Sequence, residues 1–280
     1  MTTAFVLGGG GVLGAVEVGM LRALFDHGIR PELVLGTSVG ALNGAMVARD
    51  PSPAVIGRLT DLWRGASEAR QEVYGDRPFR TVRRAVSTGT HIYSAKPLKK
   101  RLREEFGDTR IEDLPVRFQV CAASIERACE HWFDSGPVVD AVVASAAVPG
   151  LLPPAKVGDE HFLDGGIVNS IPVARAVRLG ATRIFVLQVG RVDRPLQVPR
   201  RPWEVARVSF EIARRHRFVR EMSELPDDVE AHVLPARGTS TRDDSLLGSR
   251  DFAGVQRRID ETYEASGAYL REHLAGPGAR

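Results

Sequence analysis

The sequence predicts an α/β fold in which a mostly parallel sheet carries helices on its faces. A short apolar run over Thr3–Leu7 ends in glycines, and residues 12–27 then carry apolar side chains at helical spacing. A second unit follows at once, with a buried strand over residues 33–35, a turn over 36–40 and a small-residue helix over 41–49. Two strand-to-helix units in succession are typical of parallel strands joined by helices.

The rest of the chain continues this alternation and shows no internal repeat. Residues 52–114 are polar and helical with several glycine and proline breaks, which favours a helical insertion or cap over the sheet. At 280 residues, with 43% hydrophobic and 26% charged residues, we expect a single domain around one large core. Further strands are predicted over residues 116–123, 160–164, 184–189 and 232–234, and further helices over 141–148, 203–225 and 252–273.

Composition and charge exclude several classes of protein. The formal net charge is +3, from 38 basic and 35 acidic residues, which is too balanced to indicate nucleic-acid binding. The two cysteines, Cys121 and Cys129, form neither a disulfide framework nor a metal-binding spacing, so we expect a reducing, cytoplasmic compartment and no metal. The apolar N-terminus lacks a basic segment and carries Glu17, unlike a secretion signal. No apolar run is long enough to span a bilayer, so any membrane contact should be peripheral.

The segment from Gly36 to Gly40 has the pattern G-x-S-x-G and lies between a predicted strand and a predicted helix. This is the pattern of a nucleophile elbow, in which glycines flank the serine because the sharp turn brings backbone segments together. The following helix places Ser38 at its N-terminus, where unpaired N–H groups favour developing negative charge. In isolation these residues would be a turn that caps a helix, but the strand-to-helix context favours a catalytic nucleophile.

A run of four glycines begins at Gly8, also between a predicted strand and a predicted helix. Successive backbone N–H groups there can form a nest for an oxyanion. Residues 9–14 also match G-x-G-x-x-G, the dinucleotide fingerprint, which expects an acidic residue about 20 positions on to hold a ribose hydroxyl. The second strand ends instead in the elbow, so a Rossmann-type nucleotide binder stays a weaker alternative.

Asp164 ends a predicted strand and is followed by Gly165 and Gly166. A carboxylate at this position can activate a serine hydroxyl directly as general base, whereas the simpler interpretation is a turn, because Asp-Gly is a favoured turn pair. None of the seven histidines is a convincing third member of a triad. His216 falls within a predicted helix, and His161 is three residues before Asp164 in the same predicted strand.

Four segments make the chain resemble the bacterial patatin-like phospholipases, and they occur in the order that the family has. The segments are LGGGGVLGA at residues 7–15, GTSVGALNGA at 36–45, ASAAVPG at 144–150 and DGGIVNSIP at 164–172. Together they cover about residues 4–190, and the remainder of the chain resembles the family only loosely.

The resemblance implies a three-layer α/β/α fold and cleavage of lipid esters by a Ser-Asp dyad without histidine, metal or organic cofactor. It implies that Ser38 attacks the acyl carbonyl, that Asp164 takes its proton, and that the amides of Gly9, Gly10 and Gly11 receive the oxyanion. A carboxylate that acts as base for a serine should be partly desolvated, so we expect a raised pKa for Asp164.

The substrate is less closely indicated than the reaction. Leu13 stands where the family commonly has a basic residue, so lysophospholipids, acylglycerols and thioesters are credible substrates beside phospholipids. A catalytically inactive relative that binds acyl chains is a further alternative, although the intact Ser38 and Asp164 argue against it.

Basic residues that could meet a membrane surface occur in three places. They are Arg80, Arg83 and Arg84, then residues 96–103, and then the predicted helix over 203–225 with Arg207, Arg214, Arg215, Arg217 and Arg220. That helix also carries Val205, Val208, Phe210 and Ile212, which we expect to pack on the sheet, and its charged face is then simply solvated.

Overall fold

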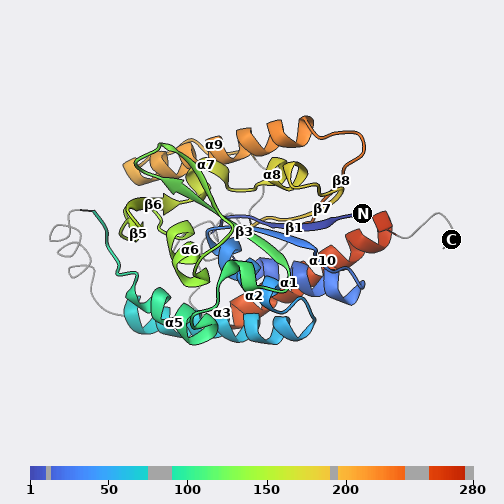
Figure 1. Ribbon diagram of the computed structural model, residues 1–280, viewed down its shortest axis with the longest axis horizontal. Coiled ribbons are helices and arrows are strands. Elements are labelled where there is room, and N and C mark those ends of the chain that lie inside the picture. The colour runs from blue at the N-terminus through green and yellow to red at the C-terminus, as the bar shows by residue number, and fades with distance from the viewer. Residues whose placement is uncertain (11–13, 75–89, 190–194, 237–251, 275–280) are drawn as a thin grey trace.

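The computed structural model of the chain describes residues 1–10, 14–74, 90–189, 195–236 and 252–274. An eight-stranded sheet lies between two layers of helices, as Figure 1 shows. The predicted three-layer α/β/α arrangement is therefore confirmed.

The centre of the sheet is parallel and one edge is antiparallel. Neighbouring strands follow the order β5-β6-β3-β2-β1-β7-β8, and β4 pairs with β3 beside this path. The strands from β3 to β8 in this order are parallel, whereas β4 and β6 run antiparallel to β3. The strands are β1 Thr3–Leu7, β2 Leu33–Thr37, β3 Arg117–Ser124, β4 Cys129–Phe133, β5 Ala155–Val157, β6 Glu160–Asp164, β7 Arg183–Leu187 and β8 Glu230–Val233.

The helices divide between the two faces of the sheet (Figure 1). One layer contains α1 Ala15–Asp26, α2 Val39–Arg49, α3 Ala54–Tyr74, α5 Lys96–Phe106, α6 Val138–Ser145 and α10 Phe252–Leu274. The other contains α7 Gly166–Asn169, α8 Val173–Arg178 and α9 Pro202–Ser223. A single 3₁₀ turn among the described residues, Ile111–Asp113, leads into β3.

The core forms on both faces because strand side chains alternate between them. On β1, Phe5 and Leu7 pack in the larger apolar cluster with α1 and α2, whereas Ala4 and Val6 pack in the smaller cluster with α8 and α9. All four are fully buried. The central strands are therefore covered on both sides, as a parallel sheet requires.

The elements predicted from the sequence lie where their patterns indicated, within a few residues at each end. The sequence reading omitted β4 and β5, two short antiparallel strands, and the short helices α7 and α8. Within residues 52–114, α3 packs against α1 and α10, and α5 packs against α6, so these helices extend the outer part of one layer.

The prediction that the apolar side chains of the helix over 203–225 pack on the sheet was partly wrong. Val205, Phe210 and Ile212 are exposed, whereas Arg214 and Glu221 on the same helix are buried. The buried face of α9 is thus partly made of paired charges, and several of its apolar residues are exposed. In the part of the chain that the structure describes, no helix is both long and apolar enough to cross a bilayer.

Candidate active site

Ser38 occupies a strained backbone position between β2 and α2. Its φ is +56° and its ψ is −121°, a conformation that side-chain-bearing residues rarely adopt. A Cβ on Gly36 would lie 2.6 Å from Cα of Ala41, and one on Gly40 would lie 2.3 Å from the carbonyl oxygen of Leu7. Both flanking glycines are therefore required by close backbone approaches, which is the local reason for the G-x-S-x-G pattern.

The sheet brings Asp164 to this turn because β2 and β6 share one edge of β3. Thr37 of β2 pairs with Cys121, and Asp164 of β6 pairs with the next residue, Ala122. The two strands run toward each other along that edge, while β4 occupies the opposite edge. Ser38, one residue beyond Thr37, therefore meets the end of β6.

Ser38 and Asp164 are hydrogen-bonded to each other. Oγ of Ser38 donates to Oδ2 of Asp164 at 2.6 Å, and the N–H of Gly166 donates to Oδ1 at 2.7 Å. Burial raises the pKa of the Asp164 carboxyl from 3.8 to about 6, while these two hydrogen bonds oppose the rise. The expected direction of the pKa shift is confirmed, and its cause is desolvation.

Two further polar contacts support the turn that carries Ser38. The hydroxyl of Ser145 accepts the N–H of Ser38 at 2.8 Å and donates to the carbonyl of Cys121 at 2.6 Å. The hydroxyl of Thr37 donates to the carbonyl of Asn169 at 2.9 Å. Sequence reasoning gave neither hydroxyl a role, although Ser145 stands in the ASAAVPG segment.

The glycine run lies beside Ser38, but only part of it is available as a donor. A Cβ on Gly9 would lie 3.4 Å from Cβ of Ser38, yet the N–H of Gly9 is already donated to the carbonyl of Ser170 at 3.0 Å. The N–H of Gly9 is therefore engaged in this conformation, and its role as an oxyanion donor stays a prediction. Gly11 and Leu13 lie outside the described residues.

Two other backbone amides, those of Gly10 and Val39, have no acceptor within the described part of the chain. Val39 is the first residue of α2, so its amide belongs to a helix N-terminus that favours negative charge. The elbow pattern could have indicated Val39, because the residue after the nucleophile commonly contributes to the oxyanion hole.

The comparisons with known proteins place the chain in a family. The patatin-like phospholipase family profile matches residues 5–177. The chain belongs to this family. Lysophospholipase nte1 of Aspergillus terreus is 34% identical over 200 residues, and NTE1 of Candida glabrata is 31% identical over 196 residues. These relatives are fungal, so they support the patatin-like family and not a bacterial branch of it.

The chain spans only a small part of those relatives. The alignments cover 69% and 67% of this chain but 12% and 10% of the fungal proteins. Among solved structures, VipD from Legionella pneumophila is 13% identical with a TM-score of 0.49, over 97% of this chain and 67% of VipD.

The patatin-like chain carries a buried polar network beneath its glycine loop. The Nδ2 group of Asn43 donates to Oε2 of Glu17 at 2.7 Å and to the carbonyl of Gly14 at 2.9 Å, and the Trp63 indole donates to Oδ1 of Asn43 at 3.1 Å. Burial raises the pKa of the Glu17 carboxyl well above its usual value, and the Asn43 bond opposes this only partly. Burial therefore favours the neutral form of the Glu17 carboxyl, and this side chain ties α1 to α2 through its contact with Asn43.

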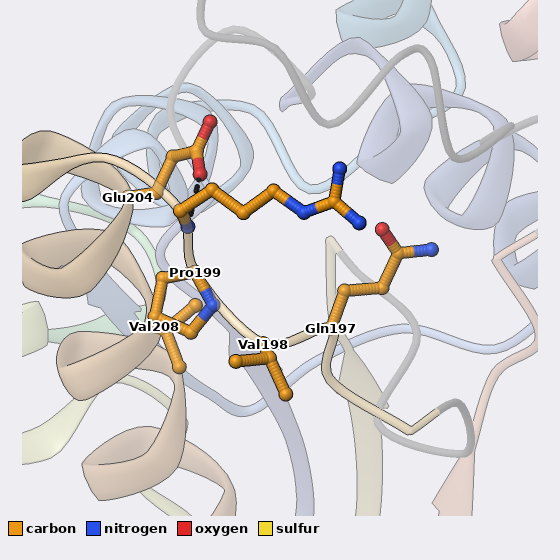
Figure 2. A pocket seen from close by; sticks show the side chains of 6 residues that line it. Gln197, Val198, Pro199, Glu204 and Val208 are labelled. Atoms are coloured by element: carbon orange, nitrogen blue, oxygen red, sulfur yellow. Dashed lines mark hydrogen bonds between the residues drawn. The ribbon is translucent and has the colours of Figure 1, made fainter.

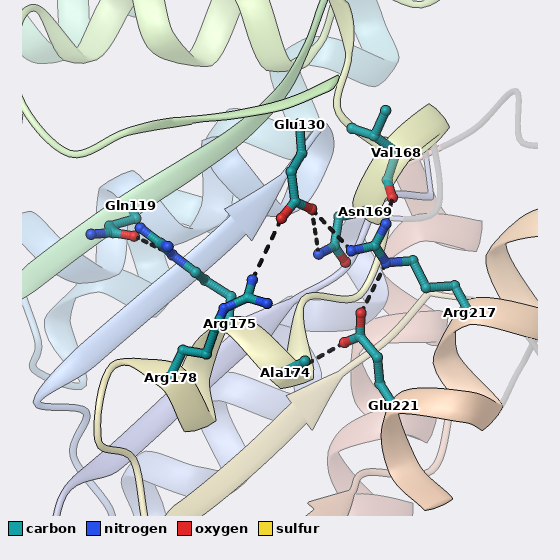
Figure 3. Close-up of polar contacts among 9 residues, drawn as sticks. All are labelled: Gln119, Glu130, Val168, Asn169, Ala174, Arg175, Arg178, Arg217 and Glu221. Carbon is teal, nitrogen blue, oxygen red and sulfur yellow. Dashed lines mark hydrogen bonds and ion pairs between the residues drawn. The ribbon is translucent and has the colours of Figure 1, made fainter. Parts of the chain in front are cut away.

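A second network holds the segment that follows Asp164, and Figure 3 shows it. Arg217 of α9 donates to the carbonyl of Val168 and pairs with Glu130 at 3.0 Å and with Glu221 at 2.9 Å. Glu130 also accepts the Nδ2 group of Asn169 at 3.1 Å. Because α9 lies beyond residues 5–177, a helix outside the matched family region supports the turn next to Asp164.

Two of the histidines have partners away from the Ser38–Asp164 pair. His161 contacts Glu126 at 2.7 Å and His232 contacts Glu230 at 2.9 Å. In the described part of the chain, no group of three or more His, Cys, Asp or Glu side chains could hold a metal ion.

Proposed function

We propose that the chain is a serine acyl hydrolase that cleaves ester bonds of lipids through an acyl-enzyme, with Ser38 as nucleophile and Asp164 as general base. The observation that carries the proposal is the 2.6 Å hydrogen bond from Oγ of Ser38 to a buried carboxylate. Membership of the patatin-like phospholipase family supports a lipid ester as substrate.

The first half of the reaction forms the acyl-enzyme. Oγ of Ser38 attacks the acyl carbonyl carbon while Asp164 takes the hydroxyl proton. The carbonyl oxygen becomes an oxyanion, and the free N–H groups of Gly10 and Val39 stabilise it, with Gly11 as the remaining candidate from the sequence. Asp164 then gives its proton to the departing alcohol oxygen, and the ester C–O bond breaks.

The second half of the reaction hydrolyses the acyl-enzyme and regenerates the free enzyme. Asp164 takes a proton from a water molecule, the hydroxide attacks the acyl carbon, and Ser38 leaves with the proton from Asp164. A carboxyl pKa of about 6 supports this role, because the group is ionised at neutral pH yet is a stronger base than an ordinary aspartate. Neither step uses a histidine.

The substrate class rests on the relatives and on one residue. The fungal relatives are lysophospholipases, so we propose lysophospholipids and phospholipids as substrates, with acylglycerols as the neutral alternative. Leu13 offers no positive charge to a headgroup phosphate. An ester panel that varies headgroup and chain length separates these substrates.

Two alternatives use the same residues differently. A Rossmann-type nucleotide binder would use the glycine run alone. In that function the Ser38–Asp164 hydrogen bond would have no role. An inactive acyl-chain binder would keep the fold without turnover. Both predict that Ser38 does not react with an acyl-transfer reagent.

The deciding experiment is labelling with a fluorophosphonate, which reacts with activated serines. We expect the wild type to be labelled, Ser38→Ala to be unlabelled, and Asp164→Asn to be labelled far more slowly. Ser223→Ala is the matched control, because that hydroxyl contacts only the carbonyl of Arg220 on exposed α9 and should leave labelling unchanged. A wild type that stays unlabelled, with folded protein verified by circular dichroism, rejects the proposal.

A further inference from the structure

Exposed apolar side chains gather on one helix of this protein. Of the eight large hydrophobic residues that the described chain exposes, six lie on α9, on the segment leading into it, or on α7 beneath it. The six are Ile167, Val198, Val205, Phe210, Ile212 and Val219. Single exposed apolar residues are normal on a protein surface, whereas such a concentration marks a binding surface.

Three of these residues form a continuous row along the outer side of α9. Val205, Ile212 and Val219 are spaced by seven residues, which is close to two helical turns, and their exposed fractions are 49%, 55% and 62%. The opposite side of the helix carries the buried Arg214 and Phe218. The row therefore faces solvent and not the core.

The charged side chains of α9 are distributed unevenly between its buried side and its exposed side. Glu211 pairs with Arg214 and Arg215, and Glu221 pairs with Arg217, so the acidic side chains are buried or half-buried. The exposed titratable residues that flank the apolar row are His216 and Arg220. Among the described residues of α9, no acidic side chain is exposed. The outer side is thus apolar with basic neighbours.

A hollow of about 750 Å³ adjoins the N-terminal end of this row (Figure 2). Val198, Pro199 and Val208 give it an apolar wall, and Val208 lies one turn along α9 from Val205. The polar part of its lining is Gln197, Arg200 and Glu204, and Glu204 accepts the backbone N–H of Arg200 at 2.8 Å. The apolar row therefore continues into a recess that also contains a basic residue.

The same helix contacts the turn that holds Asp164. A Cβ on Gly166 would lie 2.8 Å from Cζ of Phe210, and the N–H of Gly166 is the group that binds Oδ1 of Asp164. Phe210 and Ile167, on either side of Gly166, are 37% and 40% exposed. The inner side of α9 thus contacts the turn next to the Ser38–Asp164 pair, where Phe210 and Ile167 are partly exposed.

We propose that the outer side of α9, with Val205, Ile212 and Val219 at its centre, docks on the surface of an anionic lipid bilayer. The proposal rests on the proposed function, since its substrate is a lipid, and it assigns the contact to one helix. A helix with an apolar row and basic neighbours lies in the headgroup region with its apolar side chains inserted. Docking there holds α9 at the lipid surface, and the inner side of the same helix contacts Gly166 beside Asp164.

The other basic segments fit this role less well. On α5, Lys99 pairs with Asp140 and Lys100 pairs with Glu104, so two of its cations are compensated. Of the large hydrophobic residues of α5, Leu102 and Phe106 are buried and Leu98 is half-buried. Arg80, Arg83 and Arg84 lie outside the described residues.

The test measures vesicle binding and hydrolysis separately. Flotation is carried out in a Ser38→Ala background, so that the lipid is not consumed, with phosphatidylcholine vesicles with and without phosphatidylglycerol. Ile212→Asn removes the centre of the row, and Ile125→Asn is the matched control, since Ile125 is 45% exposed and belongs to the β3–β4 turn and not to α9. Thermal unfolding verifies that each variant is folded.

We expect the parent to float with the anionic vesicles, Ile212→Asn to bind about tenfold more weakly, and Ile125→Asn to bind like the parent. With Ser38 restored, Ile212→Asn should hydrolyse a water-soluble short-chain ester at the parent rate and vesicle lipid more slowly. Equal flotation of parent and Ile212→Asn overturns the proposal. So does a parent dimer that Ile212→Asn dissociates in sedimentation, because a second copy would then cover the row. Absent ester hydrolysis with intact flotation rejects the proposed function alone.

Discussion

Oγ of Ser38 donates a hydrogen bond of 2.6 Å to Oδ2 of Asp164, although 126 residues separate them in the chain. The carboxylate is buried, and its other oxygen accepts the N–H of Gly166. Burial keeps the pKa of Asp164 at about 6, and this value has consequences for both rate and stability.

The rate of ester cleavage should depend on one ionisation near pH 6. Asp164 accepts the proton of Ser38 only as a carboxylate, so kcat/KM should be full at neutral pH and fall about tenfold per pH unit below pH 6. A pH profile with a water-soluble ester measures this. A rate that stays constant from pH 8 to pH 4 would contradict the role of Asp164.

Asp164→Asn should abolish activity and stabilise the fold. The pKa of this carboxyl is higher in the folded chain than in the unfolded chain, so the folded state loses stability as the pH rises from about 4 to about 6. The neutral amide avoids that loss, and we expect the free energy of unfolding at pH 7 to rise by about 1–3 kcal/mol. Urea unfolding at pH 7 and pH 4 should show the gain shrinking at the lower pH. An equal gain in the free energy of unfolding at both pH values would mean that the charge of Asp164 is not the cause of the gain.

Glu17 should tolerate replacement by glutamine but not by alanine. Because burial raises the pKa of this carboxyl and favours its neutral form, Glu17→Gln keeps a similar shape without charge and should change the free energy of unfolding by less than about 1 kcal/mol. Glu17→Ala leaves Asn43 without one acceptor and opens a cavity, so it should destabilise by about 2–4 kcal/mol. Urea unfolding distinguishes the two. Equal destabilisation by both changes would indicate a buried carboxylate instead.

Arg217→Met should weaken catalysis more than substrate binding. The change removes the donor to the Val168 carbonyl and leaves the buried Glu221 without its cation, so the turn after Asp164 loses its support. We expect a loss of about 1–3 kcal/mol in stability and a fall in kcat with little change in KM. Arg178→Met is the control, because Arg178 is more exposed and contacts Glu130 only at 3.5 Å. An equal fall in kcat for both variants would argue against a specific role for Arg217.

Two glycine-to-alanine changes should have opposite signs. Gly40→Ala places a methyl group 2.3 Å from the Leu7 carbonyl oxygen, so it should destabilise by about 1–3 kcal/mol and reduce labelling of Ser38. Gly57 lies within α3 with open space around its Cα, and Gly57→Ala should stabilise by about 0.5–1 kcal/mol through helix propensity. Thermal unfolding of both variants measures the contrast. A Gly40→Ala variant as stable as the parent would show that the elbow can relax.

Much of the candidate site could be predicted because its signals are local. The elbow is a short segment, and Gly36 is required by its contact with Ala41 a few residues on, whereas Gly40 is required by Leu7 on β1. The order of strands and helices followed from hydrophobic periodicity, which depends only on neighbouring residues. The bond from the Gly9 amide to Ser170, a residue 161 positions away, had no local signal and could not be predicted.

The sequence by itself determined the chemical groups, a serine in a strained turn and a carboxylate at the end of a strand. Only the tertiary structure decided that they meet, because β2 and β6 end at consecutive residues, Cys121 and Ala122, along one edge of β3. It also decided which side of α9 is buried. Periodicity identifies an apolar stripe, but the paired charges of Arg217 and Glu221 hold the opposite side of this helix against the protein. Side-chain pairing across distant segments has no signature in a single sequence, so this division appears only when the chain is folded.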